Sequence, residues 1–241
     1  MNASGDPLLT VRDLHAHYGK SHILHGIDMD VPEAAIVSLL GRNGSGRSTL
    51  LKAMMGLVPP TSGTVTLAGR PLAGLRPYSI CRQGIGYVPE ERLVFPNLTV
   101  EENLAMGVQK GAAGTHRWSV EEMYDYFPRL KERRAIRAGY LSGGEQQMLT
   151  ICRSLLGNPR VLLIDEPTEG LAPKIVEVVM EVILDIGRRG VAVVLVEQKL
   201  TIALKVAREV MVMGHGELVF RGTPEELEAA PEMRRNWLEV A

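Results

Sequence analysis

A glycine-rich loop between a strand-like run and a helical pattern constrains this chain most. The apolar run at 36–40 has the length and composition of a strand covered on both faces. The segment 41–48 follows as Gly-Arg-Asn-Gly-Ser-Gly-Arg-Ser, and a helical pattern covers 48–55. In this order, backbone N–H groups and the helix N-terminus can together bind a polyphosphate. A glycine-rich turn without a ligand is the alternative.

Strand-like runs and helical patterns alternate further along the chain. Strands are predicted at 85–88, 161–165 and 191–197, and helices at 145–156 and 174–188. Strand followed by helix, repeated, is typical of an α/β fold with a mostly parallel sheet.

Two additions to this core are expected. Half-exposed strands at 8–14, 23–31 and 64–67 predict an antiparallel β subdomain. Residues 91–140 predict a mostly helical subdomain, whose most loop-like part is 109–116.

These patterns indicate one domain. The nucleotide core with its β subdomain would cover 1–90 and 141–222, the helical subdomain 91–140, and a C-terminal helical tail 223–241. Capping patterns predict helix starts at Thr99 and Thr223.

Composition excludes several classes of protein. The 27 Lys and Arg residues nearly balance 28 Asp and Glu residues, which argues against nucleic-acid binding through bulk positive charge. Aromatic residues make up 5%, too few for a platform that stacks single-stranded bases. The two cysteines favour neither a disulfide scaffold nor a structural zinc site, and they fit a reducing compartment. We expect no signal peptide and no membrane span, so any membrane role would require a partner.

The phosphate loop departs from its usual pattern at one position. Arg47 occupies the place of the lysine, and Ser48 is placed to bind Mg²⁺ through its hydroxyl. Arginine keeps the positive charge but is larger, planar and forked. We therefore expect ATP binding to survive better than accurate placement of the γ-phosphate, with slower hydrolysis as one consequence.

An acidic pair ends the predicted strand at 161–165. Asp165 at the strand end can hold Mg²⁺ through water, and Glu166 is the natural base for polarising an attacking water. A strand that merely ends in exposed acids is the alternative.

A second glycine turn opens a helix at 141–146, with the sequence Leu-Ser-Gly-Gly-Glu-Gln. Ser142 and Glu145 fit a capping box. The same turn fits a second anion site, because an ordinary cap does not need two glycines that each cost about 1 kcal/mol inside a helix.

Residues 141–146 resemble the signature motif of ABC-type ATPases, with Glu145 where that motif often has Gln. The resemblance covers nearly the whole chain, and it implies an α/β P-loop ATPase of the ABC type that binds ATP and Mg²⁺. It also implies that Tyr18 stacks on adenine. In the head-to-tail dimer of this family, the phosphate loop of one chain and the signature motif of the other enclose each ATP.

Three further positions depart from the common family pattern. Glu90 stands where many members have Gln, Gln198 stands at the histidine position, and Ala172 replaces an Asp. Together these segments resemble ATP-binding subunits of importers for branched-chain amino acids and for amides or urea. The resemblance implies transmembrane permease subunits, a second ATP-binding subunit and, indirectly, a periplasmic solute-binding protein. It implies a position on the cytoplasmic face of the inner membrane and no nucleic-acid partner.

The expected site residues fall into three groups. Nucleotide-binding residues are expected to be Tyr18, Gly41, Asn43, Gly44, Ser45, Gly46, Arg47, Ser48, Thr49, Ser142, Gly143, Gly144 and Glu145. The expected Mg²⁺ ligands are Ser48, Glu90 and Asp165. The expected catalytic residues are Glu166, Gln198 and Arg47.

Other functions remain open at this stage. The chain could be a hydrolysis-impaired regulatory subunit because of Arg47, a soluble ABC ATPase in DNA repair or translation, or a nucleotide kinase. The resemblance implies an ATP-binding and ATP-hydrolysing subunit of an importer for branched-chain amino acids, with an amide or urea importer as the alternative, and either a homodimer or a heterodimer fits it.

Two smaller features have competing interpretations. Four histidines lie in 15–25, and we expect solvated or core histidines in preference to a metal site. His215 is expected in a hairpin turn. The charged run at 131–137 is interpreted as a solvated helix face, with a permease docking surface as the alternative.

Overall fold

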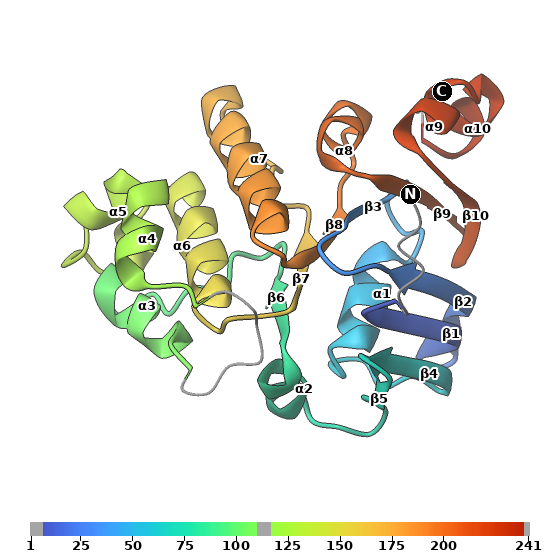
Figure 1. Ribbon diagram of the computed structural model, residues 1–241, viewed down its shortest axis with the longest axis horizontal. Coiled ribbons are helices and arrows are strands. Elements are labelled where there is room, and N and C mark those ends of the chain that lie inside the picture. The colour runs from blue at the N-terminus through green and yellow to red at the C-terminus, as the bar shows by residue number, and fades with distance from the viewer. Residues whose placement is uncertain (1–6, 110–116, 239–241) are drawn as a thin grey trace.

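The centre of the molecule is a six-stranded sheet with strand order β10-β9-β3-β8-β7-β6. The structure is a computed structural model that describes residues 7–109 and 117–238 (Figure 1). Neighbouring strands pair in parallel from β9 to β6, and β10 pairs antiparallel with β9. The predicted mostly parallel core is confirmed. Its strands are β3 (Ile36–Gly41), β6 (Ile85–Val88), β7 (Val161–Asp165), β8 (Ala192–Val196), β9 (Glu209–Gly214) and β10 (Glu217–Gly222).

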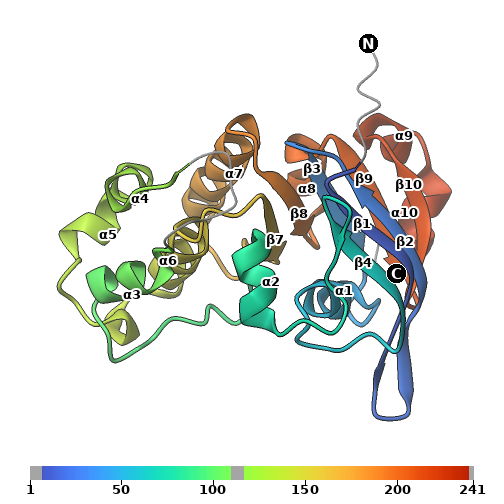
Figure 2. The same ribbon diagram turned by 60° about the horizontal axis from the view of Figure 1, so that its bottom comes forward.

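A separate four-stranded antiparallel sheet has the order β2-β1-β4-β5. Its strands are β1 (Leu9–Tyr18), β2 (Ser21–Val31), β4 (Ser62–Leu67) and β5 (Arg70–Pro71). The predicted antiparallel layer is confirmed, but its strands are longer than expected. β1 and β2 continue as a hairpin in which Tyr18 faces Ser21, and this hairpin projects beyond the sheet (Figure 2).

The parallel sheet lies between two apolar layers, because successive residues of a strand face opposite sides of the sheet. Leu39, Leu163 and Val194 belong to the apolar cluster that also contains the antiparallel sheet and α1 (Arg47–Met54). Leu162 and Val193 lie in the opposite cluster, with residues of α6 and α7. Both faces of the parallel sheet are therefore covered. In open α/β folds of this kind, ligands bind outside the carboxyl ends of the strands.

The helices follow the predicted alternation. The remaining ones are α2 (Pro77–Gln83), α3 (Val100–Gly107), α4 (Val120–Tyr126), α5 (Pro128–Glu132), α6 (Gly143–Leu155), α7 (Pro173–Arg188), α8 (Leu200–Val206), α9 (Pro224–Glu228) and α10 (Pro231–Trp237). Thr99 and Thr223 form the predicted capping boxes at the starts of α3 and α9. No helix within residues 7–109 and 117–238 is both long and apolar enough to cross a membrane.

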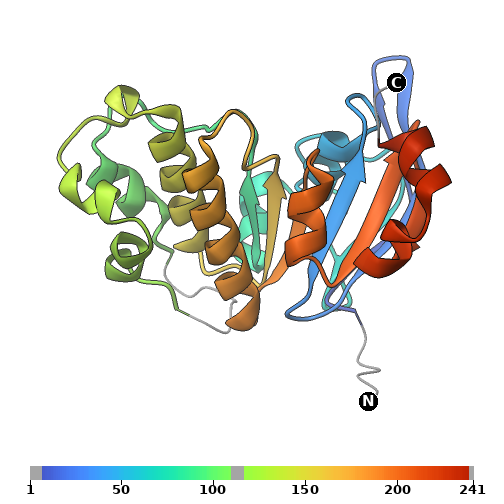
Figure 3. The same cartoon turned by 90° about the horizontal axis from the view of Figure 1, so that it is seen from above.

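The predicted helical region contains α3, α4 and α5, which lie next to α6 at the end of the molecule opposite the antiparallel sheet (Figures 1 and 3). The chain after residue 119 forms two short helices. α4 ends at Tyr126 and α5 starts at Pro128, because proline has no N–H with which to continue the preceding helix. Within the predicted loop 109–116, residues 110–116 lie outside the described residues. The division into subdomains stays a prediction.

Candidate nucleotide-binding site

The glycine-rich loop joins β3 to α1 as the sequence predicts. Gly44 and Gly46 have φ values of 80° and 103°, in the left-handed region that glycine adopts without strain. α1 begins at Arg47 with no side-chain cap, and its first turn holds no acidic residue. The first N–H groups of such a helix lack intrahelical partners, and the helix dipole favours negative charge there. This end of α1 therefore fits a phosphate chain.

A cavity of about 370 Å³ opens beside this helix end. Many of the expected site residues line it: Tyr18, Asn43, Gly44, Ser45, Gly46, Arg47, Ser48, Thr49, Glu90, Glu166 and Gln198. Tyr18 is half exposed at the end of β1, where its ring is free to stack on a base. Gly41 and Asp165 do not line the cavity.

Two lining residues were not among those expected. Ile23 lies on β2 of the same hairpin as Tyr18, and Glu169 lies in the turn after Glu166. The pairing of the two hairpin strands was the signal that could have indicated Ile23. The closeness of Glu169 depends on the fold of the loop after β7, which the sequence does not reveal.

Two of the three expected metal ligands, Ser48 and Asp165, lie close together. The Ser48 hydroxyl donates to Asp165 Oδ1 at 3.0 Å, which brings two of the expected ligands together. Burial raises the pKa of Asp165, and the hydrogen bond from Ser48 opposes that shift. Hydroxyl and carboxylate oxygens are the ligands that Mg²⁺ prefers. The donor set therefore fits Mg²⁺.

The third expected ligand, Glu90, lies in a cluster of acids. Carboxylate oxygens of Glu90, Glu166 and Glu169 lie within 4.8 Å of one another. Burial and the neighbouring Glu169 raise the pKa of Glu90. Carboxylates this close together repel one another, so a bound cation would reduce the repulsion between them.

Arg47 contacts the expected catalytic base. Its Nη2 lies 2.9 Å from Glu166 Oε1, and both side chains are less than 10% exposed. Its Nη1 donates to the carbonyl oxygen of Glu197 at 2.9 Å. Burial raises the pKa of Glu166 to about 7, against the opposing effects of Arg47 and the amide of Gln198. The guanidinium is therefore bound to protein groups and does not lie open toward the phosphate site.

The amide of Gln198 completes this contact. Its Nε2 donates to Glu166 Oε2 at 2.5 Å. Glu166 itself has a φ of 45°, which is unusual for a residue other than glycine and is typical of functional sites. All three expected catalytic residues thus meet at one carboxylate.

The second glycine turn lies elsewhere. Ser142 is the N-cap of α6, and the predicted capping box with Glu145 is present. Ser142, Gly143, Gly144 and Glu145 do not line the cavity at the phosphate loop. That these residues contact ATP held by another chain stays a prediction.

The histidines of the β1–β2 hairpin form a stack of rings. His17 and His22 lie 4.1 Å apart between ring centroids, and His22 and His25 lie 4.2 Å apart. In the part of the chain that the structure describes, the glutamate cluster is the one group of three or more residues placed to hold a metal. His215 lies in the turn between β9 and β10, as expected.

Comparison with known proteins decides the family. The profile described as "ABC transporter" matches residues 24–169. This chain belongs to the ABC transporter family. A high-affinity branched-chain amino acid transport ATP-binding protein, BraG from Pseudomonas aeruginosa, is 42% identical over 96% of this chain and 99% of that protein. A probable branched-chain amino acid transport ATP-binding protein, LivF from Archaeoglobus fulgidus, is 38% identical over 91% of this chain and 93% of its own length.

Solved structures agree with this assignment. A dimeric bacterial ABC transporter cassette superimposes with a TM-score of 0.78 and 25% identity, covering 90% of this chain and 98% of that one. The fold is therefore that of an ABC ATPase, with an α/β core and a phosphate loop. The relatives of this ABC subunit are ATPases coupled to transport.

Proposed function

We propose that this chain binds and hydrolyses ATP to drive an importer for branched-chain amino acids. The observation that carries the ATPase part is the cavity in which an uncapped helix end, Ser48 and Glu166 meet. The similarity to BraG and LivF over nearly the whole chain supports the solute. An amide or urea importer is the alternative, since the same sequence segments are typical of both.

The residues in and beside the cavity have different proposed roles in hydrolysis. The backbone amides of residues 44–48 hold the phosphates, and Arg47 adds positive charge once it leaves Glu166. Ser48, Asp165 and Glu90 would hold Mg²⁺, which supplies charge stabilisation to the phosphate oxygens when bound. Glu166 accepts the proton of the attacking water, and the amide of Gln198 donates to a γ-phosphate oxygen.

The adenine position gives a direct test of ATP binding. Tyr18→Ala is expected to raise the Kd for ATP about tenfold, because stacking on a base contributes about 1–3 kcal/mol. Titration with a fluorescent ATP analogue measures this. Tyr78→Ala removes another exposed tyrosine, which does not line the cavity, and leaves the Kd unchanged. Equal affinities of the two variants would contradict the stacking role.

A second cavity of about 400 Å³ fits the permease. It lies between β6 and α3, and exposed apolar side chains line it, among them Leu93, Phe95 and Met106. An apolar cytoplasmic segment of a permease subunit is the proposed occupant. Pro89 lines this groove, whereas the next residue, Glu90, lines the nucleotide cavity. A movement of Pro89 when a permease segment binds would therefore displace Glu90 in the nucleotide cavity.

Phe95→Asp is expected to reduce co-purification of the permease by about 30-fold or more, because an aromatic anchor of an interface commonly contributes 2 kcal/mol or more. ATP binding by the isolated chain stays unchanged, since Phe95 does not line the nucleotide cavity. Tyr78→Asp is the matched control, because Tyr78 is also exposed but lies outside the groove. Full retention of the permease by Phe95→Asp would exclude this groove as the docking site.

The chain is further proposed to form a head-to-tail dimer, with itself or with a second ATP-binding subunit, on the cytoplasmic face of the inner membrane. The dimeric relative and the position of Ser142 outside the chain's own cavity support the dimer. A solute-binding protein outside the membrane would act through the permease. Uptake of labelled leucine, acetamide and urea by cells with and without the gene tests the solute.

One other function has an observation in its favour. Arg47, the expected phosphate-binding cation, and Glu166, the expected base, are paired with each other. Such a pair is expected of a subunit that binds ATP but hydrolyses it slowly. Steady-state ATPase measurements separate this regulatory subunit from a working motor. The family membership and the relatives do not favour a nucleotide kinase or an ATPase of DNA repair or translation.

A further inference from the structure

The signature helix α6 carries a nearly buried carboxylate in its first turn. Glu145 is 7% exposed, and its Oε2 accepts hydrogen bonds at 2.9 Å from both the backbone N–H and the hydroxyl of Ser142. The helix dipole favours a negative charge at this position. In the proposed dimer, however, a γ-phosphate approaches the same helix end. An uncompensated carboxylate there would repel it.

Arg133 compensates that charge. It follows α5, and its Nη1 lies 2.9 Å and 3.1 Å from the two oxygens of Glu145. Burial would raise the pKa of Glu145, but hydrogen bonds from Ser142 and Arg133 hold it below its usual value. The carboxylate is therefore ionised and paired. Arg133, expected on a solvated helix face, lies just after the end of α5, and its side chain is 30% exposed and paired with Glu145.

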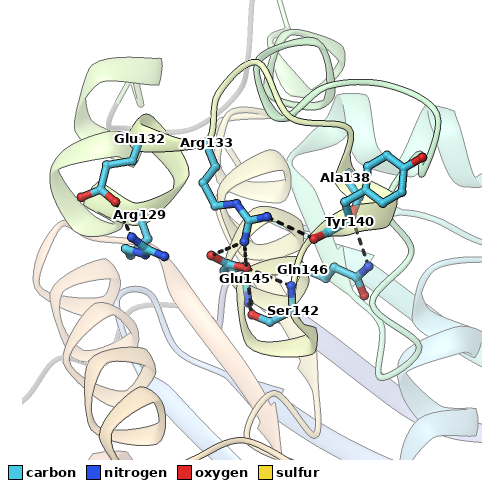
Figure 4. A network of polar contacts seen from close by, with 8 residues as sticks. All are labelled: Arg129, Glu132, Arg133, Ala138, Tyr140, Ser142, Glu145 and Gln146. Carbon is cyan, nitrogen blue, oxygen red and sulfur yellow. Dashed lines mark hydrogen bonds and ion pairs between the residues drawn. The ribbon is translucent and has the colours of Figure 1, made fainter.

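The same guanidinium ties α6 to the turn before it. Nη2 of Arg133 donates to the carbonyl oxygen of Tyr140 at 3.2 Å (Figure 4). On the other side of the turn, the amide of Gln146 donates to the carbonyl oxygen of Ala138 at 3.2 Å. The loop that presents Ser142 is thus held by two side chains, and one of them, Arg133, also neutralises the carboxylate of Glu145.

We propose that Arg133 is a positioning residue that neutralises Glu145 and so allows the Ser142–Gly143–Gly144 turn to accept the phosphate of ATP bound by a second ATP-binding chain. This inference rests on the proposed function, because it presupposes an ATP-dependent dimer. It assigns to Arg133 a role through charge in addition to its role in local structure. The charge role is what an experiment can isolate.

The neighbouring helix supplies a matched control. Arg129 pairs with Glu132 within α5 at 2.6 Å, and both side chains are more than half exposed. Figure 4 shows this pair apart from the signature helix. Exposed pairs of this kind contribute little. Arg129→Ala therefore removes the same type of residue from the same region without affecting Glu145.

The experiment measures ATP-dependent association in a Glu166→Gln parent, which is expected to bind ATP and to hydrolyse it slowly. Arg133→Ala is expected to weaken association about tenfold, whereas Arg129→Ala leaves it unchanged. The affinity for ATP of dilute, monomeric chain stays at the parent value in both, because neither residue lines the cavity. Light scattering with and without ATP and Mg²⁺ gives the first quantity, and a fluorescent ATP analogue gives the second.

A second substitution separates charge from shape. Adding Glu145→Gln to Arg133→Ala is expected to restore association to within about threefold of the parent, because glutamine keeps the capping box and needs no counter-charge. Arg133→Lys is expected to lie between the parent and Arg133→Ala. Should Arg133→Ala fail to fold, the double variant compared with Glu145→Gln alone decides, since neither leaves a buried charge unpaired. Equal association of these two supports the proposal.

Three results would contradict different parts of the proposal. An Arg133→Ala variant that associates as tightly as its parent overturns the inference and leaves the proposed function intact. A double variant as weak as Arg133→Ala overturns the charge role. A parent that does not associate with ATP overturns the proposed dimer, and the inference with it.

Discussion

Glu166→Gln is expected to reduce steady-state ATP hydrolysis by about 10²- to 10³-fold, the usual contribution of a positioned general base. Glutamine has nearly the same shape, and its one amide oxygen can still accept from Arg47, whereas the hydrogen bond that Gln198 donates to the second oxygen is lost. Glutamine cannot accept the proton of the attacking water. The loss should therefore appear in kcat.

Binding of ATP should be retained or improved in this variant. Glu166 belongs to a cluster of three acidic side chains at the phosphate site, and removing one charge reduces their repulsion toward the anionic ligand. The chain should then accumulate as an ATP-bound dimer. Phosphate release measures turnover, and light scattering with ATP or ADP measures the dimer.

Glu91→Gln is the control for Glu166→Gln. Glu91 is more than half exposed, lies next to Glu90 and does not line the cavity. Its removal is expected to change the ATPase rate less than about twofold, as surface substitutions usually do. An unchanged rate in Glu166→Gln would remove Glu166 from the role of base, and a loss of ATP binding would indicate a structural role for it.

Local sequence order was enough to predict the phosphate loop. The strand, the glycines and the helix are contiguous, so their geometry depends on neighbours along the chain. The same holds for the capping box of Ser142 and Glu145, which are separated by one turn of helix. The meeting of Ser48 with Asp165 was predictable in another way, since Ser48 follows β3 and Asp165 ends β7, two strands of the same parallel sheet, at its carboxyl edge.

Contacts of long side chains could not be predicted in this way. Arg47 contacts Glu166 and the carbonyl oxygen of Glu197, which reach it from strands far along the chain. Arg133 lies in the turn after α5 and contacts Glu145 in the first turn of α6. In both cases the residue type indicates a charge, whereas the partner depends on tertiary packing that one sequence does not reveal.

Arg47→Lys is expected to raise the ATPase rate, by about tenfold, with ATP affinity within about threefold of the original. Arg47 holds Glu166 in a buried ion pair and donates to the carbonyl oxygen of Glu197. Both contacts must break before the guanidinium reaches a phosphate. Lysine lacks the fork needed to keep both contacts, and its compact ammonium fits between the phosphates.

Arg47→Met separates the charge of Arg47 from its shape. Methionine leaves the Glu166 carboxylate without its buried partner, at a cost of about 3 kcal/mol or more in the free energy of unfolding. It also removes the cation at the phosphate site, so ATP affinity is expected to fall by about 100-fold. Thermal unfolding and titration with ATP measure the two losses.

The control for Arg47→Lys lies in the same loop. Arg42 is exposed, and Arg42→Lys is expected to change the ATPase rate less than about twofold. If Arg47→Lys instead lowers the rate, the guanidinium itself takes part in turnover, and its contact with Glu166 is not what limits the enzyme. If the rate rises as expected, the arginine slows the chain by holding its own base, and release of that contact by ATP becomes a step that a permease or a partner subunit can control.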